Sequence, residues 1–214
     1  MNAAIETQQD ALKVLGRVGA VLTSDHFVYT SGKHGSAYVN KDAVYPYTKE
    51  TARLCFFFAD HFADRQVDVV VGPEKGGIIL SQWTASMLEG TTGRKTLAVY
   101  AEKEDDRFVI KRGYEKLIPS KNILIVEDIL TTGGSAKKVF DAVRELGGNV
   151  VGLGAICNRG GVTEGDIGLL PELYSLTSVD LDSWEATECP LCAKGVPVNT
   201  TIGKGKEFLA DKQQ

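Results

Sequence analysis

Short apolar runs alternate with segments of helical spacing along most of this 214-residue chain. Four of the runs are rich in β-branched residues and predict strands. They lie at residues 67–71, 96–100, 122–126 and 150–157. Apolar residues at helical spacing follow the first and the third run, at 78–88 and 136–146. This repeated strand–loop–helix order predicts an α/β fold, a parallel sheet flanked by helices.

Weaker patterns extend the prediction toward both ends of the chain. Leu12, Leu15 and Val18 share one face of an expected amphipathic helix. Residues 27–40 predict two short strands joined by a glycine-containing turn. The complete set of outlying elements is a helix at 4–18, that strand pair, a helix at 49–65, a strand at 173–181, a turn-rich segment at 189–201 and a short helix at 204–212. We find no repeat or linker in the sequence, so a single domain over residues 1–214 is expected.

Composition narrows the class of protein. Hydrophobic residues make up 43% of the chain and charged residues 24%, as in ordinary globular proteins. The net charge of −4 argues against a general nucleic-acid binder, which usually carries a basic excess. The first ten residues are polar, and no apolar run approaches membrane-spanning length. We therefore expect a cytoplasmic protein that binds neither nucleic acid nor a membrane.

The most informative stretch is 122–135, Asn-Ile-Leu-Ile-Val-Glu-Asp-Ile-Leu-Thr-Thr-Gly-Gly-Ser. An apolar strand, expected to be buried on both faces, leads into a polar turn that opens a helix. A helix N-terminus combines free backbone N–H groups with the positive end of the helix dipole, so it binds anions, most naturally phosphate. Hydroxyl groups and glycines complete this expected phosphate cradle, which consists of Thr131, Thr132, Gly133, Gly134 and Ser135.

Two adjacent carboxylates, Glu127 and Asp128, stand where the strand is expected to end. Carboxylates beside a phosphate cradle repel the ligand unless they hold sugar hydroxyls or a Mg²⁺ ion between them. The stretch lacks the Gly-Lys-Ser/Thr ending of an ATPase phosphate loop and the Gly-x-Gly-x-x-Gly of a dinucleotide site. The alternative is an acidic turn that only caps the helix. The sequence of strand, acid pair and cradle favours a ligand site.

Two other loops fall at expected strand ends, where ligands bind in parallel sheets. The glycine-rich turn 72–77 could hold a second phosphate through backbone amides around Gly76, with Lys75 nearby. The alternative is an ordinary strand-to-helix turn. Arg159 follows the last of the four strands and could hydrogen-bond a planar anionic base with its fork of donors. Its alternative role is pairing with a surface carboxylate.

The chain has four cysteines. Cys55 and Cys157 lie in apolar patterns and are expected to be small buried residues. Cys189 and Cys192 have metal-ligand spacing, but a closed zinc site normally needs four ligands, and no second Cys-x-x-Cys or His pair follows. The histidines are far away in sequence, at His26, His34 and His61. A reduced, structural turn is therefore expected at 189–192.

The stretch 122–135 closely resembles the phosphoribosyl-pyrophosphate signature of the type I phosphoribosyltransferases. The resemblance extends over about residues 27–161, with the pieces in the expected order, and is strongest to the orotate branch of the family. It implies a type I phosphoribosyltransferase fold with a small N-terminal base-covering segment. It also implies transfer of phosphoribosyl from 5-phosphoribosyl 1-pyrophosphate to orotate, giving orotidine 5′-phosphate and pyrophosphate. The implied cofactor is Mg²⁺, bound mainly through substrate, with Asp128 as its candidate protein ligand.

The resemblance also implies roles for single residues. Glu127 and Asp128 would fix the ribose, and Asp128 could stabilise the cationic sugar. Arg159 would contact orotate, and Tyr38 matches the aromatic residue that stacks near the base. The turn 72–77 would be the pyrophosphate loop, which often carries a strained peptide bond in this family.

The polar excursion 102–112 is by its composition an exposed hairpin. The resemblance implies instead a mobile lid that closes over the site and carries a catalytic cation. Lys103 matches the lid lysine of the orotate enzymes, and Lys111 and Arg112 are substitute candidates. The family shares its lids between two subunits, so a homodimer is expected.

Two positions depart from the orotate pattern. Thr30 stands where a lysine is often found, and Glu102 stands where an arginine is usual. These departures permit a phosphoribosyltransferase that acts on another base, such as a purine. A further alternative is a non-catalytic regulator that has the same fold and senses nucleotides. The net negative charge of the chain offers little support for a regulator that binds nucleic acid.

Overall fold

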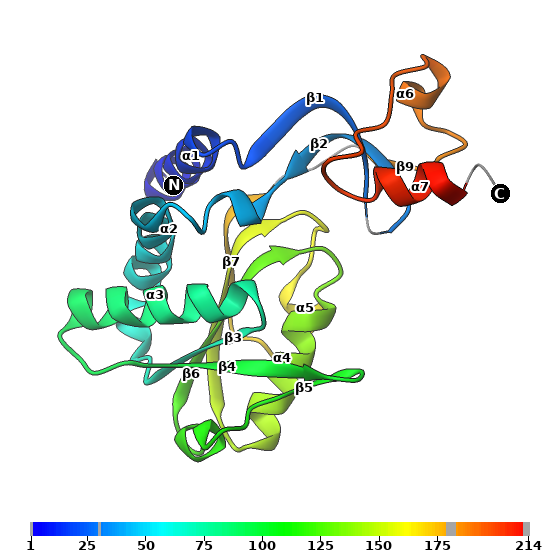
Figure 1. Ribbon diagram of the computed structural model, residues 1–214. Coiled ribbons are helices and arrows are strands. Elements are labelled where there is room, and N and C mark those ends of the chain that lie inside the picture. The colour runs from blue at the N-terminus through cyan, green and yellow to red at the C-terminus, as the bar shows by residue number, and fades with distance from the viewer. Residues whose placement is uncertain (1, 30, 179–182, 212–214) are drawn as a thin grey trace.

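The computed structural model describes residues 2–29, 31–178 and 183–211 and contains two sheets. The larger sheet has six strands in the order β5-β4-β3-β6-β7-β8, all parallel except for β5 (Figure 1). Its strands are β3 (Val69–Pro73), β4 (Leu97–Glu104), β5 (Arg107–Val109), β6 (Asn122–Leu130), β7 (Asn149–Asn158) and β8 (Leu173–Ser178). The predicted α/β class with a parallel sheet is confirmed.

Helices cover both faces of this sheet, so its central strand is buried on both sides. Leu124 and Val126 of β6 pack toward α2 and α3, whereas Ile123 and Ile125 pack toward α4. The helices are α1 (Asn2–Arg17), α2 (Thr48–His61), α3 (Gly76–Thr92), α4 (Gly134–Glu145), α5 (Glu164–Ile167), α6 (Pro190–Ala193) and α7 (Gly205–Asp211). The described residues also form three short 3₁₀ helices, which are η1 (Lys41–Ala43), η2 (Ala63–Arg65) and η3 (Tyr114–Leu117).

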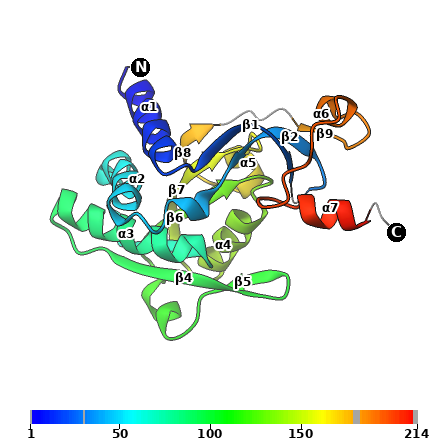
Figure 2. The ribbon, with the colours of Figure 1, turned by 45° about the horizontal axis from the view of Figure 1, so that its top comes forward.

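The smaller sheet joins distant parts of the chain. Its order is β1-β2-β9, with β1 (Val21–Val28), β2 (His34–Val39) and β9 (Ser183–Trp184). Both neighbouring pairs are antiparallel. The β1–β2 hairpin stands to one side of the large sheet, with α6 and α7 at its far end (Figures 1 and 2). This hairpin is the predicted N-terminal segment, now extended by a strand from near the C-terminus.

Several strands are longer than predicted, and two of them, β6 and β1, change the description of the site and of the hairpin. β6 continues through the acid pair to Leu130, because its pairing with β7 persists to Leu130 and Asn158. The two carboxylates are therefore strand residues and do not lie in a turn. β1 begins at Val21, before the predicted start at Phe27, and its register shifts between Thr23 and Phe27. That bulge breaks the alternation from which a strand is predicted.

The N-terminal helix differs from its prediction in one detail. Leu12 is 40% exposed, while Leu15 is fully buried and Val18 is partly buried. Neighbouring Ala11 and Val14 belong to the buried face instead. Cys55 and Cys157 are buried, as predicted.

At the other end of the chain, residues 179–181 of the predicted last strand lie outside the described residues, as does Lys212 of the predicted short helix. Within the described residues, no helix is long and apolar enough to cross a membrane.

Candidate active site

A cavity of about 300 Å³ lies at the carboxyl ends of the central strands, under the β1–β2 hairpin. Ligand sites of parallel sheets lie at this edge. The cavity brings together seven of the predicted site residues, which are Tyr38, Gly76, Glu127, Asp128, Thr131, Ser135 and Arg159. These residues come from the small hairpin, the 72–77 turn, β6, the cradle and the loop after β7.

Asp128 is buried and held from three sides. Its Oδ2 accepts hydrogen bonds from Lys41 Nζ at 2.5 Å and from the Tyr45 hydroxyl at 3.1 Å. Its Oδ1 accepts a hydrogen bond from the backbone N–H of Ile129 at 2.7 Å. Burial by itself would lower the pKa of Lys41, but the neighbouring acidic groups, above all Asp128, together outweigh it, so the pKa of Lys41 is raised. The pair is thus a fixed ammonium–carboxylate contact at the cavity wall.

Glu127 has a different environment from its neighbour. It is 6% exposed, and its Oε1 accepts a hydrogen bond from the backbone N–H of Asp128 at 2.9 Å. Burial, reinforced by the negative charge of Asp128, raises the pKa of Glu127 to about 8. Near neutral pH Glu127 of the ligand-free site therefore carries a proton.

The raised pKa of Glu127 predicts how the free energy of unfolding depends on pH. Between about pH 4.5 and pH 8 the folded protein keeps a proton on Glu127 that the unfolded chain releases. Stability therefore falls as pH rises through this window, by up to about 1.4 kcal/mol per pH unit. The side chain in the Glu127→Gln variant cannot ionise, so the free energy of unfolding of this variant should not decrease in this way. Urea denaturation of both proteins without ligand, at several pH values, measures the difference.

The matched control is Glu145→Gln, because Glu145 is an exposed residue of α4. This variant should follow the pH dependence of the wild type. Stability curves for wild type and Glu127→Gln that stay parallel from pH 4.5 to pH 8 would contradict the raised pKa.

The predicted phosphate cradle lies between β6 and α4 and encloses a second hollow of about 120 Å³. Thr131, Thr132 and Ser135 are exposed at its rim. Gly133 has φ +73°, and a Cβ there would press on Val162 and Ile167. The turn therefore requires glycine at this position, both for its backbone conformation and for space. The helix begins at Gly134, and Gly134, Ser135 and Ala136 of its first turn line the hollow, so the helix N-terminus lies at the cradle, as the sequence predicts.

The 72–77 turn approaches the acid pair closely. A Cβ on Gly76 would overlap the Asp128 carboxylate and the Tyr45 hydroxyl, so only glycine allows this contact. The peptide bond between Glu74 and Lys75 is cis. Both side chains are exposed, and Glu74 Oε1 accepts a hydrogen bond from the backbone N–H of Lys103 at 3.1 Å. The turn thereby connects the cavity to the base of the 102–112 excursion.

Arg159 also lines the cavity. Its guanidinium Cζ lies 5.0 Å from the centre of the Tyr29 ring, and its Nη2 donates to Thr131 Oγ1 at 3.1 Å. Tyr29 stacks beside Tyr38, with ring centroids 6.4 Å apart. The hairpin therefore supplies an aromatic wall next to a planar cation, a combination suited to a flat anionic ligand.

The 102–112 excursion is an antiparallel hairpin formed by the end of β4 and by β5. Lys111 pairs with Glu102 at 3.0 Å and with Glu104 at 2.5 Å, and Arg112 also pairs with Glu102. Lys103 is exposed, and its ammonium takes part in none of the salt bridges among the described residues. Of the three candidate lid cations, Lys103 is therefore the one that is not neutralised within the hairpin.

The structure does not bring every predicted residue to the main cavity. Thr132, Gly133 and Gly134 line the adjoining hollow, and the remaining candidates, Lys75, Lys103, Lys111 and Arg112, line neither space. Thr30 lies outside the described residues.

Sequence reasoning missed three residues of the site, namely Lys41, Tyr45 and Tyr29. The available signal was a cation two residues after Val39, at the end of the base-covering segment, and a tyrosine close behind it. That pattern alone does not indicate which carboxylate the two residues contact.

Comparison with known proteins shows which protein family this chain matches. Residues 43–180 match the sequence profile of the family described as "Phosphoribosyl transferase domain". The chain is 35% identical to an orotate phosphoribosyltransferase of Thermoanaerobacter sp. (strain X514), over 89% of this chain and 95% of that protein. It is 32% identical to an orotate phosphoribosyltransferase of Chlorobium phaeobacteroides, over 90% of this chain and 94% of that protein.

A solved structure shares the fold at lower identity. The orotate phosphoribosyltransferase of Mycobacterium tuberculosis H37Rv, crystallised in complex with 5-phospho-α-D-ribosyl 1-diphosphate, superimposes with a TM-score of 0.61. Its identity to this chain is 21%, and the match covers 80% of this chain and 96% of that one.

Proposed function

Since this chain belongs to the phosphoribosyltransferase family, and within it to the orotate phosphoribosyltransferases, we propose that it transfers phosphoribosyl from 5-phosphoribosyl 1-pyrophosphate to orotate. The products are orotidine 5′-phosphate and pyrophosphate, a step of pyrimidine (UMP) biosynthesis. The observation that carries the proposal is the cavity in which an acid pair, a phosphate cradle and an aromatic–arginine wall meet at one sheet edge.

Catalysis rests on positioning and on charge. As the bond from C1′ to pyrophosphate breaks, the ribose gains positive charge and the leaving group gains negative charge. Asp128 lies at the cavity wall and stabilises the cationic ribose, while Glu127 helps to fix the ribose hydroxyls. Thr131, Ser135 and the backbone N–H groups at the start of α4 hold the 5′-phosphate. The 72–77 turn, with Gly76 and Lys75, holds the pyrophosphate.

Mg²⁺ fits the donor set, because carboxylate oxygens are the ligands that this hard cation prefers. We assign it mainly to the phosphates and ribose hydroxyls of the substrate, with Asp128 as the candidate protein ligand. When bound, it supplies positive charge that offsets the charge growing on pyrophosphate. Lys103 lies on the lid, so closing of the lid brings a second positive charge to the site. The closed lid also excludes water.

Arg159 and Tyr38 define the base subsite. The fork of the guanidinium pairs with the orotate carboxylate, and the cation over Tyr29 keeps the fork oriented. Tyr38 provides an aromatic surface for the pyrimidine ring. This arrangement assigns base selection to the β1–β2 hairpin and to the loop after β7.

Arg159→Lys tests this assignment. Lysine keeps the positive charge but loses one arm of the fork, and a hydrogen bond to a charged group is worth about 1.5–3 kcal/mol. KM for orotate should therefore rise about tenfold or more, while KM for 5-phosphoribosyl 1-pyrophosphate changes little. Steady-state kinetics with each substrate varied in turn measures both constants.

Arg144→Lys is the matched control, since Arg144 is an exposed residue in the last turn of α4. It should leave both KM values unchanged. An equal rise of both constants in Arg159→Lys, or no rise at all, would assign Arg159 a structural role.

A panel of bases tests the proposed reaction as a whole. The purified protein is mixed with 5-phosphoribosyl 1-pyrophosphate, Mg²⁺ and one base at a time, and pyrophosphate release is followed. Pyrophosphate release with orotate, and with no other base of the panel, supports the proposal. Release with adenine, guanine or hypoxanthine instead would favour the purine alternative, and release with none of them would favour the nucleotide-sensing regulator.

We also propose a homodimer in which the lid of one subunit serves the site of the other. The supporting observation is the polar β4–β5 hairpin, which extends past the strands beside it (Figures 1 and 2). The side chain of Asp106, at the tip of this hairpin, is fully exposed. The cytoplasmic location expected from the sequence stays a prediction.

A further inference from the structure

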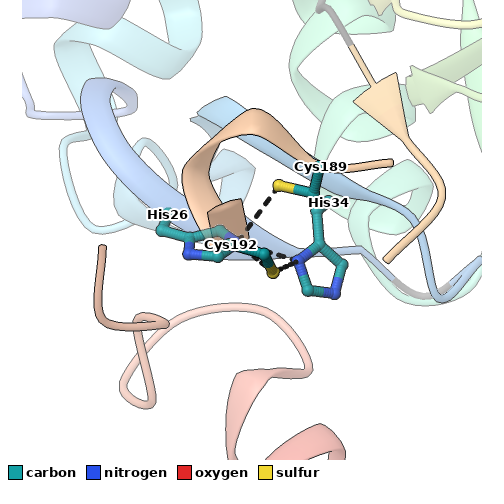
Figure 3. Close-up of side chains that lie close together, drawn as sticks. All are labelled: His26, His34, Cys189 and Cys192. Atoms are coloured by element: carbon teal, nitrogen blue, oxygen red, sulfur yellow. Dashed lines mark hydrogen bonds between the residues drawn. The ribbon is translucent and has the colours of Figure 1, made fainter. Parts of the chain in front are cut away.

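Four side chains from two distant parts of the sequence lie close together at the far end of the β1–β2 hairpin. His26 comes from β1 and His34 from the start of β2. Cys189 directly precedes α6, and Cys192 lies within that helix. Figure 3 shows the four side chains pointing toward one another. Their candidate ligand atoms all lie within 4.8 Å of one another.

The distances between these atoms suit a tetrahedral zinc ion. With Zn–S bonds of about 2.3 Å and Zn–N bonds of about 2.0–2.1 Å, the edges of the tetrahedron measure about 3.3–3.8 Å. His26 Nε2 lies 3.6 Å from Cys189 Sγ and 3.8 Å from Cys192 Sγ. His34 Nδ1 lies 3.4 Å from Cys192 Sγ. The two ring nitrogens are closer, at 2.8 Å, which is a hydrogen-bond distance that an ion between them would widen slightly.

The surroundings orient one of the ligands. The other ring nitrogen of His26, Nδ1, lies 2.8 Å from the carbonyl oxygen of Val196. Because a carbonyl only accepts, this nitrogen carries the proton, and Nε2 is left with its lone pair directed into the cluster. A histidine that donates its second N–H to a backbone carbonyl is the usual arrangement at protein zinc sites.

Burial and charge also favour a closed metal site. His26, His34 and Cys189 are almost fully buried, at 0%, 0% and 2% exposure. Within the part of the chain that the structure describes, neither Cys189 nor Cys192 forms a disulfide bond. Two thiolates and two neutral imidazoles would balance the charge of Zn²⁺, so the buried complex would be neutral. Four protein ligands leave no position for water or substrate, which distinguishes a structural site from a catalytic one.

We propose that His26, His34, Cys189 and Cys192 bind one structural Zn²⁺ ion. Binding displaces the two thiol protons, shifts the proton of His34 from Nδ1 to Nε2, and replaces the hydrogen bond between the imidazoles with metal–nitrogen bonds. The reduced turn predicted from the sequence supplies two ligands, and the hairpin supplies the two that the sequence pattern lacked. His61, on α2, is paired with Glu172 and is not part of the cluster.

The ion would fasten the C-terminal segment, residues 183–211, onto the hairpin. Other contacts between these segments include a two-residue strand pairing between β9 and β2, backbone hydrogen bonds such as the one from Lys204 N–H to the Val28 carbonyl, and a side-chain hydrogen bond from Asn199 to Asp25. A two-residue strand pairing is weak by itself. The metal would therefore stabilise the hairpin that carries Tyr29 and Tyr38, at a distance from the chemistry.

The first experiment measures metal content. Wild-type protein, stripped with a chelator under reducing conditions, is incubated with Zn²⁺ alone, desalted and analysed by elemental mass spectrometry. About one zinc per chain is expected, and the double variant Cys189→Ala/Cys192→Ala should retain less than a tenth of that. Cys55→Ala is the matched control, because Cys55 is a buried thiol outside the cluster, and it should bind zinc like the wild type. A wild type that binds no zinc, or a double variant that binds as much as the wild type, overturns the site.

Two further measurements do not depend on the folding of the cysteine variant. Cobalt(II) added to the stripped wild type should give the visible and thiolate charge-transfer absorption of a tetrahedral site with sulfur ligands. A spectrum of six-coordinate cobalt without the thiolate band overturns the proposal. Asp128→Asn should keep its zinc, whereas loss of zinc in that variant would move the ion to the active site.

Thermal stability distinguishes binding of Zn²⁺ from binding of Mg²⁺. At a Zn²⁺ concentration about a hundredfold above Kd, the Tm of the stripped wild type should rise by roughly 5–10 °C. Mg²⁺ alone should not reproduce this shift, because the ligands are nitrogen and sulfur. Equal shifts with the two ions, or no shift with zinc, would overturn the stabilising role.

Discussion

Replacing Asp128 by asparagine is expected to lower kcat by about 100-fold or more while the fold survives. That is the scale of losing one preorganised charge that acts on the transition state. The structure adds a second reason. Oδ2 of Asp128 accepts hydrogen bonds from Lys41 and Tyr45, and Oδ1 accepts one from a backbone N–H. An amide has only one acceptor oxygen, so its NH₂ group must face one of these donors. Single-turnover and steady-state rates of pyrophosphate release measure the loss.

Two controls accompany this variant. Asp141→Asn makes the same chemical change on an exposed residue of α4 and should leave kcat unchanged. Tyr45→Phe removes one hydrogen bond to Asp128 but keeps its charge, so its loss should be far smaller than that of Asp128→Asn. Wild-type turnover in purified Asp128→Asn would end the assignment of Asp128 to the ribose. An unchanged circular-dichroism spectrum would show that a loss of activity is not a loss of fold.

Mixing two inactive variants is expected to restore activity if subunits share their lids. Lys103→Ala removes the lid cation, and Asp128→Asn removes the ribose carboxylate. In a hybrid dimer with crossing lids, the Lys103→Ala subunit keeps an intact ribose site and receives an intact lid from its partner. Random pairing makes half of the dimers hybrids with one good site each, so about a quarter of all sites should recover. Activity before and after subunit exchange is the measurement.

The structure supplies a control for this mixture. Lys111→Ala removes a cation that the hairpin already neutralises through Glu102 and Glu104. If Lys103 is the lid cation, this variant alone should keep far more activity than Lys103→Ala. A mixture of the two inactive variants no more active than its parents, with exchange verified by differently tagged chains, would show that each lid acts within its own subunit.

Local patterns were enough to predict the architecture and the centre of the site. Strands and helices follow from apolar periodicity within a few residues, and the phosphate cradle is contiguous with its strand and helix. The order of strands and helices in the sequence therefore determined the sheet class and placed Glu127, Asp128 and Thr131 at its carboxyl edge. The bulge in β1 broke this local signal, and there the predicted boundary was wrong.

Contacts between distant segments were decided only by the tertiary structure. Lys41 and Asp128 are 87 positions apart, and His26 and Cys189 are 163 positions apart. No local pattern links such pairs, because their proximity depends on how the hairpin folds over the sheet and on where the C-terminal segment returns. The raised pKa of Glu127 likewise comes from burial by surrounding elements. Sequence alone thus determined which residue types could bind phosphate or metal, while packing decided which of them meet, and with what charge.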